Sequence, residues 1–186
     1  ITGGSDGLGR ATSRRFASEG AKVVICARRE EHLMQAAEDL RKETNGSVLG
    51  MKADVCKAED CTKLIDQTVE EFGGIDILIN NAGILRDRSF KNMTDDEWDA
   101  VVEVHLKGSY LATKHAWKEM LEQGDGGRII MTSSTSGLIG NFGQTNYGAA
   151  KAGLAGFMRV LALEGMKYGI TVNVLAPGAL SRMTED

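Results

Sequence analysis

The chain has 186 residues, enough for one domain with a sizeable core, and its formal net charge is −4. Its mixed charges contain no basic run, which excludes nucleic acid or an anionic membrane surface as a partner held by charge, and no apolar stretch is long enough to span a bilayer. Cys26, Cys56 and Cys61 show neither metal nor disulfide spacing, which predicts free thiols in a reducing, cytoplasmic setting.

Predicted strands and helices alternate along the chain. Apolar runs predict strands over residues 23–27, 48–53, 75–79, 128–132 and 170–175. Helical patterns predict helices over residues 10–19, 30–44, 59–72, 94–123 and 147–167, and the fourth begins with a Thr94 cap and Glu97 three residues on. This alternation predicts an α/β fold, a doubly wound parallel sheet with helices on both faces, in one three-layer α/β/α domain.

Both ends of the chain are abrupt for such a fold. Only Ile1 and Thr2 precede a glycine-rich loop, although a loop of that kind normally leaves a strand at the centre of the sheet. The chain also stops a few residues after Pro177 and Gly178. We therefore expect residues 1–186 to be a fragment of a longer protein, lacking most of the first strand and the C-terminal segment.

The glycine-rich loop precedes the first predicted helix. Gly3, Gly7 and Gly9 follow the spacing T-G-x-x-x-G-x-G, with Ser5 and Leu8 between them. Glycines let a backbone turn tightly and approach a pyrophosphate, which the positive end of the next helix would hold. Structural turns alone are the alternative, but the strand–helix units that follow favour a dinucleotide site.

The end of the strand over residues 23–27 indicates which dinucleotide binds. Ala27 stands where an acidic residue would bind the adenosine ribose, and Arg28 and Arg29 follow it. An arginine can pair with a 2′-phosphate, so NADP(H) is preferred and NAD(H) is the alternative. Asp6 argues against NADP(H), because it lies in the glycine loop close to the expected 2′-phosphate. Ordinary solvated charge at a helix start is the other interpretation of the arginines.

Two further strand ends predict cofactor contacts. Asp54 and Val55 follow the strand over residues 48–53, where a carboxylate would accept a hydrogen bond from the adenine amino group or only cap a turn. The tetrapeptide N-N-A-G at 80–83 closes the strand over 75–79. We expect Asn81, Ala82 and Gly83 to line the cofactor cleft; a plain Asn/Gly turn is the alternative.

Tyr147 and Lys151 lie four residues apart in the helix predicted over 147–167, so their side chains share one helix face. A positive charge beside a phenol lowers its pKa from about 10 toward neutrality. Such a tyrosine takes a proton from an alcohol or gives one to a carbonyl. For a bare Y-x-x-x-K pattern, a tyrosine packed against a surface lysine is the commoner interpretation, and only the rest of the chain favours chemistry.

Five motifs follow one another along the chain in an order and at a spacing that one enzyme family shares. They are T-G-x-x-x-G-x-G, N-N-A-G, Ser134, Y-x-x-x-K and Pro177-Gly178. With these motifs the chain resembles the compact, single-domain branch of the short-chain dehydrogenase/reductase family over essentially its whole length. The resemblance implies a Rossmann-type fold assembled as a homotetramer or homodimer. It also implies an NAD(P)-dependent oxidoreductase that interconverts a secondary alcohol and a ketone in a small-molecule substrate.

The resemblance assigns catalytic roles to three residues. Tyr147 takes the place of the general acid/base. Lys151 takes the place of the lysine that lowers the tyrosine pKa and hydrogen-bonds the nicotinamide ribose. Ser134 takes the place of the serine that holds the substrate oxygen; without the family spacing, a serine in this Ser/Thr-rich run would indicate turn chemistry.

Other positions depart from the family pattern or extend it. His105 replaces an asparagine that orients a proton-relaying water, and a histidine there would titrate near neutral pH; a packed histidine is the alternative. Gly178 and Leu180 are expected beside the nicotinamide. Arg182 stands where family members often have a threonine, and Ser181 or Thr184 is the alternative for the contact that this threonine makes. No cluster of ligands predicts a metal site.

The second half carries a finer resemblance. Residues 81–90, 105–109, 140–144 and 181–184 resemble the (3R)-hydroxyacyl-CoA dehydrogenase unit of the peroxisomal multifunctional enzymes, although Ala-Arg-Arg at 27–29 is closer to NADPH-using reductases. The candidate substrates are 3-hydroxyacyl or 3-oxoacyl thioesters, or steroid-like alcohols. A non-catalytic dinucleotide-binding sensor or scaffold is the alternative, but we expect it to lack a member of the Ser-Tyr-Lys set. A sugar-nucleotide epimerase would show T-G-x-x-G-x-x-G, which this chain does not.

Overall fold

The computed structural model of the chain describes residues 1–178. Within that range the strands are β1 (Val23–Ala27), β2 (Val48–Lys52), β3 (Ile77–Asn80), β4 (Gly127–Thr132) and β5 (Ile170–Leu175). The helices are α1 (Gly7–Ser18), α2 (Glu30–Thr44), α3 (Ala58–Phe72), α4 (Asp95–Val102), α5 (Gly108–Gln123), α6 (Thr135–Leu138) and α7 (Thr145–Gly165). The shorter helical turns are η1 (Phe90–Asn92), η2 (Glu103–Lys107) and η3 (Met166–Tyr168).

The strands pair in parallel in two groups, one of two strands and one of three, which the first residues of the chain connect. β1 pairs with β2, while β3, β4 and β5 pair in that order. Thr2 forms a parallel bridge to Cys26 of β1, and its N–H donates to the carbonyl of Ile79 in β3 at 3.0 Å. Residues 1–2 therefore lie at the centre of the sheet, between β1 and β3, where we expected a strand.

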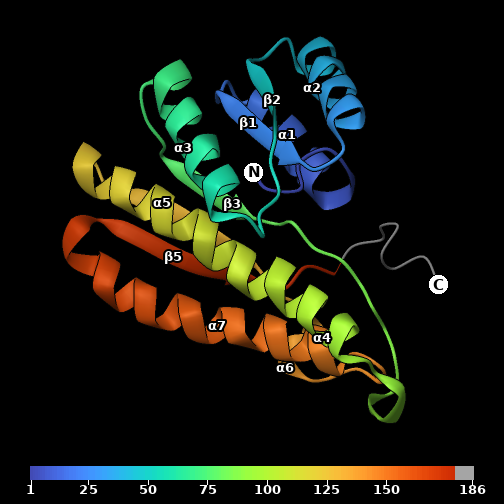
Figure 1. The fold of residues 1–186 in the computed structure, drawn as a ribbon. Helices are drawn as coiled ribbons and strands as arrows, with labels where there is room; N and C mark the ends of the chain where they lie inside the picture. The colour runs from blue at the N-terminus through green and yellow to red at the C-terminus, as the bar shows by residue number, and fades with distance from the viewer. Residues whose placement is uncertain (179–186) are drawn as a thin grey trace.

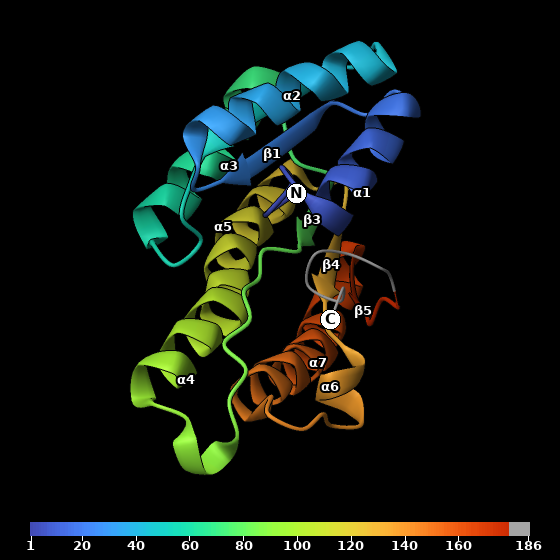
Figure 2. The same ribbon diagram turned by 90° about the vertical axis from the view of Figure 1, so that its right-hand side faces the viewer.

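Helices cover both faces of the sheet (Figures 1 and 2). Val23 and Ile25 of β1 pack into one cluster with side chains of α1 and α2, whereas Val24 and Cys26 pack with Leu64 of α3 on the other face. The largest cluster joins β3, β4 and β5 to α3, α5 and α7. The predicted three-layer α/β/α fold is confirmed.

Most predicted elements form where local patterns placed them. The strands at 23–27 and 170–175 and the helix at 30–44 have the predicted bounds, and in β2, β4 and α3 one end differs from the prediction by one residue. α1 begins at Gly7 rather than at residue 10, because the Asp6 side chain accepts a hydrogen bond from the Gly7 N–H at 3.1 Å and caps the helix there. β3 begins at Ile77 rather than at residue 75, since both backbone polar groups of Ile75 bond the Gln123 side chain instead.

The helical stretch predicted over 94–123, as one helix or more, is divided. It starts at the predicted capping box, in which Thr94 and Glu97 each bond the other's backbone N–H. One turn of π-helix, η2, then separates α4 from α5 and carries His105. A π turn rotates the following residues around the helix axis and is found frequently at functional sites. The short α6 was not predicted, and α7 begins at Thr145, two residues before the expected start.

Candidate active site

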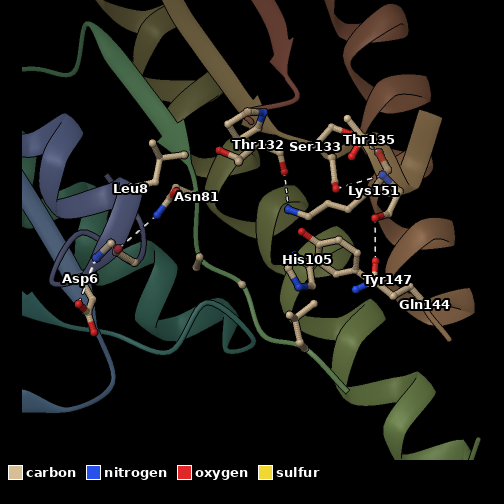
Figure 3. A pocket seen from close by; sticks show the side chains of 18 of the residues that line it. Asp6, Leu8, Asn81, His105, Thr132, Ser133, Thr135, Gln144, Tyr147 and Lys151 are labelled. Atoms are coloured by element: carbon tan, nitrogen blue, oxygen red, sulfur yellow. Dashed lines mark hydrogen bonds between the residues drawn. The ribbon is translucent and has the colours of Figure 1, made fainter. Parts of the chain in front are cut away.

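A cavity of about 920 Å³ lies where the strands end, between the glycine loop and the start of α7 (Figure 3). Its lining gathers most of the residues that the sequence singled out. Those residues are Gly3, Ser5, Gly7, Leu8, Arg28, Asn81, Ala82, Gly83, His105, Ser134, Tyr147, Lys151 and Gly178. Gly9, Asp54 and Val55 are not part of this lining, and Leu180 and Arg182 lie outside the described residues.

The three glycines of the loop have different roles. A Cβ on Gly9 would stand 2.2 Å from the carbonyl oxygen of Gly3, so Gly9 allows α1 to pack against the loop. It does not line the cavity, so the observed role of Gly9 is packing, and its predicted cofactor contact stays a prediction. Gly3 has a positive φ of 64° and approaches Ala82, whereas Gly7 begins α1 with φ 49° and open space around its Cα. The loop fits a pyrophosphate, because the backbone N–H groups at the start of α1 lie beside the open space at Gly7.

Asp54 and Val55 line a smaller hollow of about 120 Å³ that shares Gly3, Ala27, Arg28, Ala82 and Gly83 with the main cavity. Asp54 Oδ1 accepts a hydrogen bond from the Cys56 N–H at 3.1 Å. This bond caps the turn, which was the alternative to the predicted contact with the adenine amino group. Val55 is buried in the core. The hollow therefore adjoins the main cavity at the ends of β1 and β2.

The charges around the glycine loop bear on the choice of dinucleotide. Arg28 is exposed and lines both cavities. Asp6 lies 3.9 Å from the Arg29 guanidinium and 3.8 Å from the His32 ring. The acid that argued against a 2′-phosphate thus has basic side chains as neighbours.

Tyr147 and Lys151 lie in the first turns of α7 and line the same part of the cavity (Figure 3). Lys151 Nζ stands 5.4 Å from the centre of the Tyr147 ring and donates a hydrogen bond to the Thr132 carbonyl. The Ser133 hydroxyl donates to the Lys151 carbonyl at 2.8 Å. The end of β4 therefore holds the lysine at both its backbone and its ammonium group.

The protonation behaviour of this pair differs from our expectation. Burial lowers the pKa of Lys151 from its ordinary 10.5 to about 8. Burial raises the pKa of Tyr147; a hydrogen bond with the Ser134 side chain opposes the rise and the charge of Asp87 adds to it. The predicted lowering of the tyrosine pKa by Lys151 is wrong for this structure, because desolvation of the phenol outweighs other effects and the ammonium bonds to a carbonyl instead.

His105 is 1% exposed and lies edge-on to the Tyr147 ring, with 5.0 Å between the ring centres. Its Nε2 lies 2.8 Å from the Ile84 carbonyl oxygen and 3.0 Å from the Ile84 nitrogen, while Nδ1 is buried without a hydrogen-bond partner among the residues described. Burial, followed by the charge of Lys151, lowers the His105 pKa to about 3. The expected titration near neutral pH is therefore wrong, and the imidazole is neutral in that range.

The structure adds polar residues that sequence reasoning missed. Asn146 is completely buried: its side-chain oxygen accepts from the Tyr147 N–H at 2.7 Å, and its amide donates to the carbonyls of Arg86 and Glu97, each at 3.0 Å. It ties Tyr147 to two other segments. Gln144 likewise lines the cavity. Asn146 directly precedes the tyrosine and Gln144 stands three residues before it, but a single amide residue carries no local signal of its long-range partners.

Two negative findings concern residues 1–178 alone. No three His, Cys, Asp or Glu side chains of this range gather in a way that could hold a metal ion. Each helix of the same range is too short or too polar to cross a lipid bilayer.

Comparisons with known proteins agree with the geometry. A family model described as short chain dehydrogenase matches residues 1–185. The peroxisomal hydratase-dehydrogenase-epimerase of Neurospora crassa is 47% identical over 190 residues, which cover 100% of this chain and 21% of that protein. The peroxisomal multifunctional enzyme type 2 of Mus musculus is 42% identical over 194 residues, covering 100% of this chain and 26% of that protein. The 3-oxoacyl-[acyl-carrier-protein] reductase of Synechocystis sp. is 40% identical over 187 residues, covering 100% of this chain and 75% of that protein.

The relatives differ in how much of their length this chain matches. It spans about a fifth to a quarter of the two peroxisomal relatives and three quarters of the reductase.

Proposed function

Because this chain belongs to the short-chain dehydrogenase/reductase family, we propose that it interconverts a secondary alcohol and a ketone by hydride transfer with a nicotinamide coenzyme. Family membership confirms the resemblance drawn from the motifs and the assignment to an enzyme of this family. One observation supports the proposed reaction above others: Ser134, Tyr147 and Lys151 line one cavity together with the glycine loop.

The coenzyme, when bound, supplies or accepts the hydride. Among the residues of this chain, Gly7 and the start of α1 would hold the pyrophosphate, and Arg28 would hold a 2′-phosphate, which favours NADP(H) over NAD(H). Lys151 would bind the nicotinamide ribose. The adjoining hollow lined by Asp54 and Val55 would receive the adenine.

The remaining wall would complete the site. Asn81, Ala82, Gly83 and Gly178 also line the cavity and would contact the coenzyme.

Tyr147 provides the proton chemistry. Its raised pKa keeps it a phenol, the form that donates a proton to a carbonyl oxygen during reduction. Ser134 donates a hydrogen bond to the same oxygen and stabilises the charge that develops on it. Oxidation of an alcohol needs the phenolate, so we expect its rate to rise with pH. Neutral His105, which packs edge-on against the tyrosine ring, would position that ring and would take the place of the family asparagine that orients a proton-relaying water.

The proposed substrates are 3-oxoacyl and 3-hydroxyacyl thioesters, with steroid-like alcohols as the other candidate. The reductase from Synechocystis is named for a 3-oxoacyl group, and the two peroxisomal relatives are named as multifunctional or as containing a dehydrogenase. These names describe those proteins, and their similarity to this chain supports the thioester class.

The test is a coenzyme absorbance assay with acetoacetyl thioester and NADPH or NADH. Turnover is expected, and Tyr147→Phe should abolish it while changing coenzyme affinity by no more than about twofold, because the phenol hydroxyl acts on the substrate. Tyr110→Phe is the matched control, because Tyr110 is exposed on α5 and does not line the cavity, and it should retain wild-type rates. Wild-type rates in Tyr147→Phe would refute the mechanism. Coenzyme binding without turnover on any alcohol or ketone would favour the non-catalytic sensor.

We also propose a homo-oligomer formed through α5, α7 and η3. Leu163 and Met166 are 71% and 72% exposed there. They line a mainly apolar hollow whose other lining residues are Trp117, Leu121, Glu164, Lys167 and Tyr168. A second copy of the chain would cover this surface. Light scattering should give a dimer or tetramer that Leu163→Glu dissociates, and a wild-type monomer would refute the proposal.

The proposed compartment is a reducing one. Cys26, Cys56 and Cys61 are free thiols, which suits the cytoplasm, our candidate, whereas two relatives are named as peroxisomal.

A further inference from the structure

The end of the cavity that lies beyond Tyr147, away from the glycine loop, is walled by an anchored carboxylate. Asp87 lines this end, and its Oδ2 accepts a hydrogen bond from Gln144 Nε2 at 2.7 Å. Gln144 is in turn held through its Oε1, which accepts from the Ser136 hydroxyl at 2.7 Å and from the Asn141 amide at 3.3 Å. The segment over residues 136–144, far from Asp87 in the sequence, therefore holds this carboxylate beside the tyrosine.

The carboxylate is close enough for its charge to act on the reacting group. The charge of Asp87 contributes to the raised pKa of the Tyr147 phenol. A substrate oxygen that receives the proton of that phenol would lie within the same field.

The two arginines next to Asp87 in the sequence bond to groups other than this carboxylate. Arg86 donates to the Leu85 carbonyl at 2.7 Å, and Arg88 pairs with Glu97 at 2.8 Å; neither belongs to the cavity lining. Lys151 does line the cavity, but it is 3% exposed and its ammonium bonds to a backbone carbonyl. In the described lining, the arginines stand at the glycine-loop end. The substrate end thus presents a negative charge without a basic side chain exposed to meet an anion.

The rim next to this wall is apolar. Ile139 and Phe142 are 86% and 90% exposed, and Leu138 is exposed beside them. These residues lie between Ser136 and Gln144, both of which line the cavity. An acyl chain that leaves the cavity here would meet apolar side chains.

We propose that Asp87 makes the enzyme select uncharged acyl derivatives, such as thioesters and esters, and reject free 3-oxo and 3-hydroxy acids. This inference rests on the proposed function and names the charge of its substrate. In a free 3-oxo acid the carboxylate is two carbons from the reacting carbonyl, so it would approach Asp87 whenever that carbonyl reached Tyr147. Two like charges at that separation repel, and the neutral thioester avoids the cost.

The experiment compares three substrates that share one reacting group. These are the N-acetylcysteamine thioester of acetoacetate, which carries no phosphate, ethyl acetoacetate and acetoacetate itself. The measured quantity is the ratio of kcat/KM for the acid to kcat/KM for the thioester. Asp87→Asn is isosteric and still accepts from Gln144, and it should raise this ratio about tenfold, a figure reduced for the solvent exposure of Asp87. Asp87→Lys should raise the ratio further.

Asp125→Asn is the matched control, because it removes the same charge from an exposed loop before β4 that does not line the cavity. It should leave the ratio unchanged. Added salt should also raise the wild-type ratio by screening the repulsion.

Each outcome decides the inference. If the wild type reduces the thioester but Asp87→Asn and Asp87→Lys keep the ratio within about twofold of wild type, the inference is refuted while the proposed function stands. If neither thioester, ester nor acid is turned over with either coenzyme, the proposed function fails, and the inference fails with it.

Discussion

Lys151 should make the stability of this fold depend on pH in a way that one substitution can isolate. The side chain is 3% exposed, and burial lowers its pKa from 10.5 to about 8. The fold therefore holds the ammonium less favourably than the unfolded chain does, by about 3 kcal/mol. Since so little of the side chain is exposed, solvent screening reduces this figure little.

Whether stability rises or falls with pH depends on which state binds the Lys151 proton. Between pH 8 and pH 10.5 the unfolded chain binds the Lys151 proton and the folded chain releases it, so stability rises with pH in this window. Above the unfolded pKa the amine is neutral in both states and the fold carries no cost from it. This gain in stability is lost as the pH falls through about 8, below which the buried ammonium carries its full cost. From pH 7 to about pH 9.5, the free energy of unfolding should gain about 2 kcal/mol from this group alone.

The assay is urea unfolding of wild type and Lys151→Met at a series of pH values, with the difference between the two curves plotted against pH. Methionine has a similar length and no charge, so other titrating groups cancel in the difference. Lys118→Met is the matched control, because Lys118 is exposed on α5 and pairs with Glu122 at 3.4 Å. Its curve should run parallel to wild type. Parallel curves for wild type and Lys151→Met would refute the reasoning, because they would mean that the buried amine does not titrate in this window.

Three further predictions concern the coenzyme site and the support of Tyr147. Arg28→Ala should weaken NADPH about tenfold more than NADH in fluorescence titrations; equal losses would remove the 2′-phosphate argument. A Cβ at Gly9 would stand 2.2 Å from the Gly3 carbonyl oxygen, whereas one at Gly7 meets nothing within 4 Å. Gly9→Ala should therefore lose about 3 kcal/mol of unfolding free energy and Gly7→Ala about 1, and similar losses in urea unfolding would contradict this. Asn146→Ala leaves two carbonyls without their buried donor, so the free energy of unfolding should fall by about 2 kcal/mol. The variant should also reduce kcat more than it changes KM. An unchanged free energy of unfolding would show that the Asn146 amide does not stabilise the fold.

Local patterns in the sequence were enough for the layers of the fold and for most of the site. Apolar runs identified β1 and β5, and helical periodicity identified α2, because both signals lie within a few consecutive residues. The glycine spacing and the i, i+4 spacing of Tyr147 and Lys151 are local in the same sense. For that reason the sequence alone could indicate the end of the sheet at which the cavity lies.

Only the tertiary structure decided what depends on segments that meet from far apart. The start of β3, the contact of His105 with Ile84 and the amide network around Asn146 each involve partners many residues away. The pKa directions of Tyr147 and His105 were wrong from sequence, because desolvation depends on burial, which residue types and spacings do not contain. Spacing along the chain determined which groups share the cavity, whereas packing determined their charge states and hydrogen-bond partners.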